Sequence, residues 1–166
     1  MTRRSIIFGA PIQSGTHQAG CVMGPASLRT AGLIASLQAL GWEVEDQGDL
    51  SIPGQSALPH ANPAVHHLAE TRAWIELLTT RAEAAAANSD LPVFLGGDHS
   101  MSAGTMAGVA AHAARLGRPL FVLWLDAHPD LHSLDTTESG NLHGTPVAYA
   151  CGLDGFEAYP PLAHAI

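Results

Sequence analysis

The sequence is poor in positive charge and in long apolar runs. Seven Lys and Arg residues stand against fifteen Asp and Glu residues, which gives a formal net charge of −8 at pH 7. An acidic chain of this kind argues against nucleic acid and anionic membranes as partners. No apolar stretch approaches the ~18 residues that a membrane span needs, so the sequence predicts a soluble protein.

The sequence has only two cysteines, and its amino terminus does not fit an export signal. The two cysteines, Cys21 and Cys151, lie far apart and in no CxxC spacing, which favours reduced thiols in a cytoplasmic protein over a disulfide scaffold. The apolar run after the first arginines is about five residues long, shorter than the apolar region of an export signal. We therefore expect a first β-strand there.

Several common catalytic motifs are missing. The chain has no GxxxxGK[ST] phosphate loop and no GxGxxG after a strand, which argues against nucleotide binding through those motifs. The serines of GGDHSMSAG at residues 96–104 do not fit the GxSxG pattern of a nucleophilic serine. The two glycines of that segment are better explained by a close approach of the backbone to a metal site.

What the sequence does contain is an alternation of strand-like and helix-like segments over 166 residues, a length that suits one domain. Apolar and β-branched runs predict strands, and three- and four-residue apolar spacing predicts helices. The expected strands cover residues 4–8, 42–46, 91–95 and 119–125, the expected helices cover 25–41, 64–88 and 102–117, and a loop covers 51–63. The order βαβαβαβ predicts an α/β domain with a parallel sheet, in which the last strand, apolar on both faces, is central.

Two groups of acidic and imidazole side chains follow the third and fourth expected strands. Asp98 and His99 come after one strand, and Asp126, His128 and Asp130 come after the next. Ligand sites in parallel α/β sheets lie beyond the carboxyl ends of the strands, so both groups should meet at one edge. In an extended segment, the i, i+2, i+4 spacing of the second group points its three side chains the same way.

These residue types predict a site for divalent metal ions. Carboxylate oxygen and imidazole nitrogen without thiolate favour Mn(II), followed by Fe(II), Co(II) or Zn(II). A carboxylate at the strand end, such as Asp126, could bridge two ions that activate a water molecule for hydrolysis. The alternative is an ordinary hydrogen-bonded turn. The remaining histidines in loops and on helix faces are expected to be surface or core residues: His17, His60, His66, His67, His112 and His164.

Four segments together carry a family resemblance. GPASLRTAGL at residues 24–33, GGDHS at 96–100, DAHPD at 126–130 and SGNLHG at 139–144 resemble, in this order and spacing, the amino-terminal half of the arginase branch of the ureohydrolase family. The resemblance implies a three-layer α/β fold with a mostly parallel sheet. It also implies a pair of manganese ions, hydrolysis of the guanidinium group of L-arginine to L-ornithine and urea, and a trimeric or hexameric assembly.

The resemblance assigns roles residue by residue. It implies that His99 and Asp130 bind one manganese, that His128 binds the other, and that Asp126 bridges them. Asp130 thereby belongs to the catalytic centre as well as to the metal site.

Further roles fall in the SGNLHG segment, where the resemblance makes His143 the residue that carries protons to the leaving amine. It also makes Ser139 and Asn141 contacts to the α-carboxylate of the substrate and its water shell. His132 stands where arginases usually carry an asparagine in the substrate site, so an agmatinase or guanidinobutyrase remains an alternative.

A second departure concerns the length of the chain. The family's later SxDxDxxDP metal motif is absent from this sequence, so residues 1–166 are expected to be a single partial domain with an incomplete set of ligands. Such a chain should hydrolyse little or no substrate by itself. A non-catalytic metal-binding fragment or interaction module is therefore the alternative from outside the enzyme class.

Overall fold

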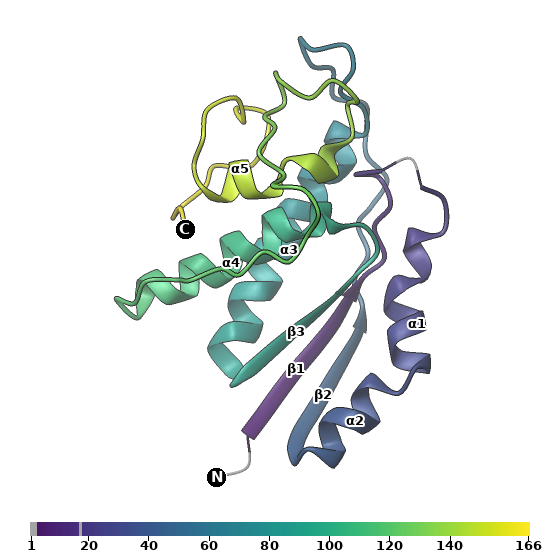
Figure 1. The fold of residues 1–166 in the computed structure, drawn as a ribbon, viewed down its shortest axis with the longest axis vertical. Coiled ribbons are helices and arrows are strands. Elements are labelled where there is room, and N and C mark those ends of the chain that lie inside the picture. Colours follow the sequence, from purple (N-terminus) through teal and green to yellow (C-terminus); the bar gives the residue numbers. More distant parts are fainter. Residues whose placement is uncertain (1–2, 17) are drawn as a thin grey trace.

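The computed structural model describes residues 3–16 and 18–166. Within them, three parallel strands form a sheet in the order β2-β1-β3, with β1 (Arg3–Ala10) between β2 (Trp42–Asp49) and β3 (Leu91–Gly96) (Figure 1). The last six residues of β1 are buried, as expected for a central strand covered on both faces. The first three predicted strands and their parallel arrangement are confirmed.

Helices cover both faces of this sheet, which confirms the three-layer α/β fold. Figure 1 shows α1 (Gly24–Thr30) and α2 (Leu33–Ala39) on one side and α3 (Leu68–Asn88) on the other, with α4 (Ser102–Arg115) packed along α3. The short elements are the 3-10 turns η1 (Cys21–Met23), η2 (His99–Met101) and η3 (Leu142–Gly144), followed by helix α5 (Pro146–Ala150). No helix in the described part of the chain has the length and hydropathy to cross a membrane.

All three predicted helices are observed, but each differs in its bounds or is interrupted. The expected helix over residues 25–41 is divided into α1 and α2 because Gly32 adopts a left-handed conformation with φ +90°. The expected helix over 64–88 begins only at Leu68, after His67, whose φ of +54° is also left-handed. Helix α4 begins at Ser102 as expected and ends two residues before the predicted stop at Gly117.

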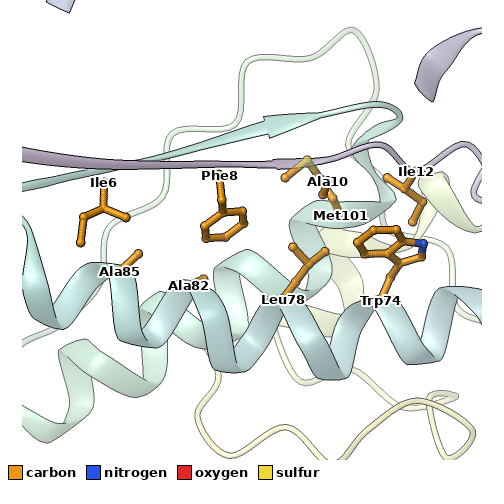
Figure 2. Packing of buried hydrophobic residues seen from close by; sticks show 9 residues of the cluster. All are labelled: Ile6, Phe8, Ala10, Ile12, Trp74, Leu78, Ala82, Ala85 and Met101. Atoms are coloured by element: carbon orange, nitrogen blue, oxygen red, sulfur yellow. The ribbon is translucent and has the colours of Figure 1, made fainter. Parts of the chain in front are cut away.

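The main core lies between β1 and α3. Figure 2 shows Ile6, Phe8 and Ala10 of the strand facing Trp74 and Leu78 of the helix. Phe8 and Leu78 are completely buried, and each large apolar side chain buried in this way contributes roughly 1.5–3 kcal/mol. This packing fixes the end of β1, next to which the polar residues after β3 lie.

Helix α4 approaches α3 closely because two of its residues are glycines. A Cβ at Gly108 would lie 2.3 Å from the carbonyl oxygen of Thr79, and one at Gly104 would lie 2.7 Å from the Cβ of Leu78. Because α4 starts three residues after His99, this contact holds the amino end of α4, and with it η2, against the core.

The fourth predicted strand is not formed. Residues 119–125 pair with no strand in the described residues, and Phe121, Leu123 and Leu125 are 85%, 69% and 85% exposed. A strand that is apolar on both faces is stable only with a paired neighbour and a covering layer on each side. The described residues provide neither around this segment, so the expectation of a central fourth strand is wrong for this chain.

Candidate metal centre

The carboxyl end of β3 is held in place by backbone contacts to the segment after β1. The N–H of Gly97 donates to the carbonyl of Ala10 (3.1 Å), and the N–H of Asp98 donates to that of Ile12 (2.8 Å). A Cβ at Gly97 would lie 1.9 Å from the Ile12 oxygen, so a side chain there would separate the two segments. Gly97 thus permits the close approach of the two backbones.

Three predicted ligands converge beyond this strand end. His99, Asp126 and Asp130 each offer one ligand atom, and the three atoms lie within 4.8 Å of one another. His99 begins η2, whereas the two aspartates come from the irregular segment after residue 125. The prediction that both groups of residues meet at one edge of the sheet is therefore confirmed for these side chains.

Asp130 is the buried member of this cluster. It is 6% exposed, and its Oδ2 has no hydrogen-bond partner among the described residues. Its backbone is left-handed with φ +48°, and its carbonyl accepts the N–H of Ala148 of α5 (3.2 Å). A buried carboxylate oxygen without a donor is costly unless a cation compensates it. This orphaned oxygen, 3.4 Å from His99 Nε2, fits a cation site.

Asp126 adds a second carboxylate to the site. Its Oδ1 accepts the backbone N–H of His128 at 2.9 Å, and this bond is the main reason why the pKa of Asp126 lies below its usual range. The carboxylate is therefore anionic near neutral pH and available to a cation. The same hydrogen bond bends the chain away from the extended conformation that the i, i+2, i+4 spacing assumes.

His128 consequently lies apart from the three converging ligand atoms. Its side chain is 79% exposed, and its Nδ1 is 3.6 Å from Asp126 Oδ1. The backbone carbonyl of His128 accepts the indole N–H of Trp124 at 3.3 Å. The three side chains of Asp126, His128 and Asp130 thus do not point the same way. The two carboxylates converge with His99, and the imidazole of His128 between them in the chain points to solvent.

His143 lies against His99. Its Nδ1 is 3.2 Å from His99 Nε2, and the two ring centroids are 4.7 Å apart. Burial lowers the pKa of His143, and the neighbouring His99 lowers it further. A neutral imidazole at this position can accept a proton and pass it on.

The predicted substrate contacts, His132, Ser139 and Asn141, precede this histidine in the chain. Asn141 is half-buried and its Oδ1 lies 3.2 Å from His66 Nε2, while the Ser139 hydroxyl accepts the N–H of Asn141 at 3.3 Å. His132 is exposed and joins the same loop through its N–H, which donates to the Gly144 carbonyl at 3.2 Å. The three side chains thus lie along one loop that continues into η3.

Two residues around the site, Trp124 and His66, were not predicted from the sequence as part of it. Trp124 places its ring centroid 6.1 Å from that of His99, and its position two residues before Asp126 was the only signal. His66, expected to be a surface or satisfied core residue, is half-buried, and its Nε2 lies 3.2 Å from Asn141 Oδ1; no pattern in the sequence links residues so far apart. Asp98 was noted as a neighbour of His99, but its bonds to the backbone could not be foreseen.

The other histidines are not part of the converging group within the described chain. His60 Nε2 lies 3.9 Å from Asp135 Oδ1. His67 and His164 are exposed, and His112 is half-buried on α4. His17, for which a surface or core position was expected, lies outside the described residues. A pocket of about 780 Å³ lies between residues 52–59 and 65–70, and none of the three converging ligands lines it.

Comparison with known proteins identifies relatives of the chain. Residues 3–159 match the Arginase family. The arginase of Agrobacterium fabrum is 58% identical over 157 residues, which cover 95% of this chain and 48% of that protein. The arginase of Bacillus subtilis superposes with a TM-score of 0.82 at 35% identity, over 99% of this chain and 52% of the other.

A structure of Entamoeba histolytica arginase in complex with L-ornithine has a TM-score of 0.77 at 27% identity, over 99% of this chain and 54% of that one. The chain thus spans about half the length of the relatives that it matches. The match to the family extends over nearly all of its residues, and the fold agrees. The chain belongs to the arginase family.

Proposed function

We propose that this chain forms part of a manganese-dependent ureohydrolase of the arginase type, which hydrolyses the guanidinium group of L-arginine to L-ornithine and urea. The observation that carries the proposal is the convergence of His99, Asp126 and Asp130 around the orphaned Asp130 oxygen. Oxygen and imidazole donors without thiolate suit Mn(II). The arginase names of the relatives support the choice of substrate.

Each residue has a role in this proposal. His99, Asp126 and Asp130 would hold the divalent ions, and His128 would join them only after its exposed ring turns inward. Bound divalent ions supply the positive charge that makes water a nucleophile at neutral pH.

Proton transfer and substrate recognition fall to the loop of η3. His143, neutral because of its lowered pKa, takes up a proton and delivers it to the leaving amine of ornithine. Ser139 and Asn141 donate hydrogen bonds to the α-carboxylate of the substrate. At position 132 an imidazole stands where arginases usually carry an amide, and the imidazole offers fewer hydrogen-bonding groups. This difference lowers the expected selectivity for arginine over agmatine.

The ligand set in this chain is small for two ions with six-coordinate preferences. We propose that residues 1–166 are one partial domain, and that a further polypeptide segment supplies the remaining ligands and covers the open side of the sheet. The outer edge of β3, which pairs with no strand in the described residues, and the exposed side chains of Phe121, Leu123 and Leu125 support this view, since both are costly to leave in water. A cytoplasmic, trimeric or hexameric enzyme is the completed form that we infer.

The first test is manganese binding by the chain itself. Mn(II) is added to the purified chain and free ion is followed by electron paramagnetic resonance. Asp130→Asn should weaken binding roughly 10-fold or more, by analogy with losses of metal-site residues. The matched control Asp154→Asn, an exposed acid after α5, should bind as the parent does. Equal binding by both variants would remove the proposed site.

The second test concerns the reaction. Urea release from L-arginine and from agmatine is measured with the chain alone and with the chain joined to the half of the Agrobacterium fabrum arginase that it does not match. The chain alone should release no detectable urea, and the joined protein should prefer arginine. Equal rates with both compounds would overturn the arginine assignment, and full activity of the chain alone would refute the incomplete site.

A further inference from the structure

We propose that Asp98 is a positioning residue, which holds the segment around Gly15 so that this segment fixes His143 beside His99. The inference rests on the proposed function only for the role of His143. Asp98 Oδ2 accepts the N–H of Gly15 at 2.9 Å, and the carbonyl of Gly15 accepts the N–H of His143 at 3.0 Å. A single glycine thus connects a buried carboxylate after β3 to the backbone of the proposed proton carrier.

Both carboxylate oxygens of Asp98 accept hydrogen bonds from backbone N–H groups. Its second oxygen, Oδ1, accepts the N–H of Ser100 at 2.9 Å, and the residue is 6% exposed. Charge-assisted bonds from a buried carboxylate to N–H groups are stronger than bonds between neutral groups. Asp98 is also outside the group of ligand atoms that converge with His99, so it acts on the site through the backbone rather than as a ligand.

The close approach requires glycine at position 15. A Cβ there would lie 2.5 Å from the Cβ and Oγ of Ser100 and 2.6 Å from Asp98 Oδ1. The segment after β1 therefore sits directly on the turn that begins η2. Because His99 lies between Asp98 and Ser100, the hydrogen bonds of Asp98 fix the backbone of His99 on one side and that of His143, through Gly15, on the other.

The consequence concerns the contact between the two imidazoles. His143 Nδ1 lies 3.2 Å from His99 Nε2, and this contact exists only while both backbones keep their places. A displacement of the order of 1 Å at a reacting group can reduce a rate by about 100-fold. Loss of the bond between Asp98 and Gly15 releases the anchor of the His143 N–H, although Asp98 touches neither imidazole.

The variant Asp98→Asn separates this role from simple packing. An asparagine has one acceptor oxygen and an NH₂ group, so one of the two N–H groups that face position 98 meets another donor. The matched control is Asp90→Asn at the other end of β3, where Asp90 Oδ2 accepts the N–H of Arg4 at 2.8 Å. Both changes replace a carboxylate that accepts a backbone N–H, but only the first lies next to the site.

The experiment is amide hydrogen exchange by NMR on the 166-residue chain. Asp98→Asn should speed the exchange of the Gly15 and His143 amides at least 10-fold and shift the ring ¹⁵N signals of His143, while the β3 amide of Leu95 stays within twofold. Asp90→Asn should leave His143 within twofold. Faster exchange at Gly15 with unchanged His143 exchange and ring signals would reduce Asp98 to a structural residue and overturn the proposal.

A measurement on the unmutated chain covers the case in which Asp98→Asn does not fold. The hydrogen bond between His143 and Gly15 should give a scalar coupling between the His143 nitrogen and the Gly15 carbonyl carbon. Its absence in the folded parent chain would overturn the proposal without any variant. None of these readouts needs metal or urea release, so a failure of the proposed arginase activity leaves them interpretable and is recognised separately.

Discussion

His143 Nδ1 lies 3.2 Å from His99 Nε2, the same nitrogen that is 3.4 Å from Asp130 Oδ2. One imidazole nitrogen therefore faces both a buried carboxylate and a second imidazole. Because a hydrogen bond between two ring nitrogens needs one donor and one acceptor, one of the two nitrogens in this contact carries a proton and the other accepts it. The proposed proton carrier thus touches the site without being one of its ligands.

The position of His143 beside His99 predicts that loss of its imidazole affects urea release much more than manganese binding. In the chain joined to the missing half, His143→Ala should lower urea release by roughly 10²–10⁴-fold, the usual range for loss of a general acid or base. Manganese affinity should change by less than about threefold, because His143 supplies no ligand atom to the cluster. His164→Ala, at an exposed position, is the control. A loss of manganese affinity as large as that of Asp130→Asn would make His143 a ligand instead.

The close contact at Gly97, directly after β3, predicts that substitution by alanine destabilises the chain more there than at Gly54. Gly97→Ala should lower the free energy of unfolding by about 2–3 kcal/mol, because the added Cβ overlaps the Ile12 oxygen and overpacking of this kind has such a cost. Gly54→Ala, where a Cβ meets nothing within 4 Å, should stay within about 0.5 kcal/mol of the parent. Urea denaturation measures both values. Equal stabilities would show that the two segments can separate without loss.

The exposed segment at 119–125 predicts a binding defect without a folding defect. Phe121→Asp should leave the free energy of unfolding within about 0.5 kcal/mol, since Phe121 is 85% exposed. It should prevent the chain from forming a complex with the co-expressed half of the Agrobacterium fabrum arginase, as followed by size-exclusion chromatography. Leu40→Asp, 69% exposed after α2, is the control. Complex formation by both variants would exclude this surface as the contact.

An ion pair beside β2 predicts the dependence of stability on pH. Arg29 Nε and Nη2 lie 2.7 and 2.9 Å from the two oxygens of Asp46, and this hydrogen bonding lowers the pKa of Asp46. The stabilisation is therefore fully present above the pKa of the unfolded chain, about 4, and is lost as pH falls through the lower pKa of the folded state.

Asp46→Asn should accordingly cost about 1 kcal/mol at pH 7, a value suited to a partly exposed pair. The difference from the parent should shrink as the pH is lowered below about 4. Denaturation at a series of pH values measures it, with Glu43→Gln on the same strand as the control. A difference that is constant with pH would mean that the Asn side chain, rather than the lost charge, is responsible.

Much of the fold was predictable because its signals are local. The apolar run ending in Phe8, the helical spacing through Trp74 and Leu78, and the motif after β3 each depend on a few neighbouring residues, and the observed strands and helices follow them. The type of donor at the site was likewise readable, because His99, Asp126 and Asp130 follow strand-like runs whose ends should meet.

The tertiary structure decided which of these groups meet. The bond from the His128 N–H to Asp126 and the left-handed backbone of Asp130 turn His128 to solvent and bury Asp130, and neither follows from the spacing. The apolar run at 119–125 has the composition of a strand, but a strand forms only where a partner edge and covering layers exist. Composition is a property of a short segment, whereas the strand that pairs with it is supplied by distant residues. The sequence alone therefore determined the metal-ligand residue types and most helices and strands. Packing between distant segments determined which of these ligands converge.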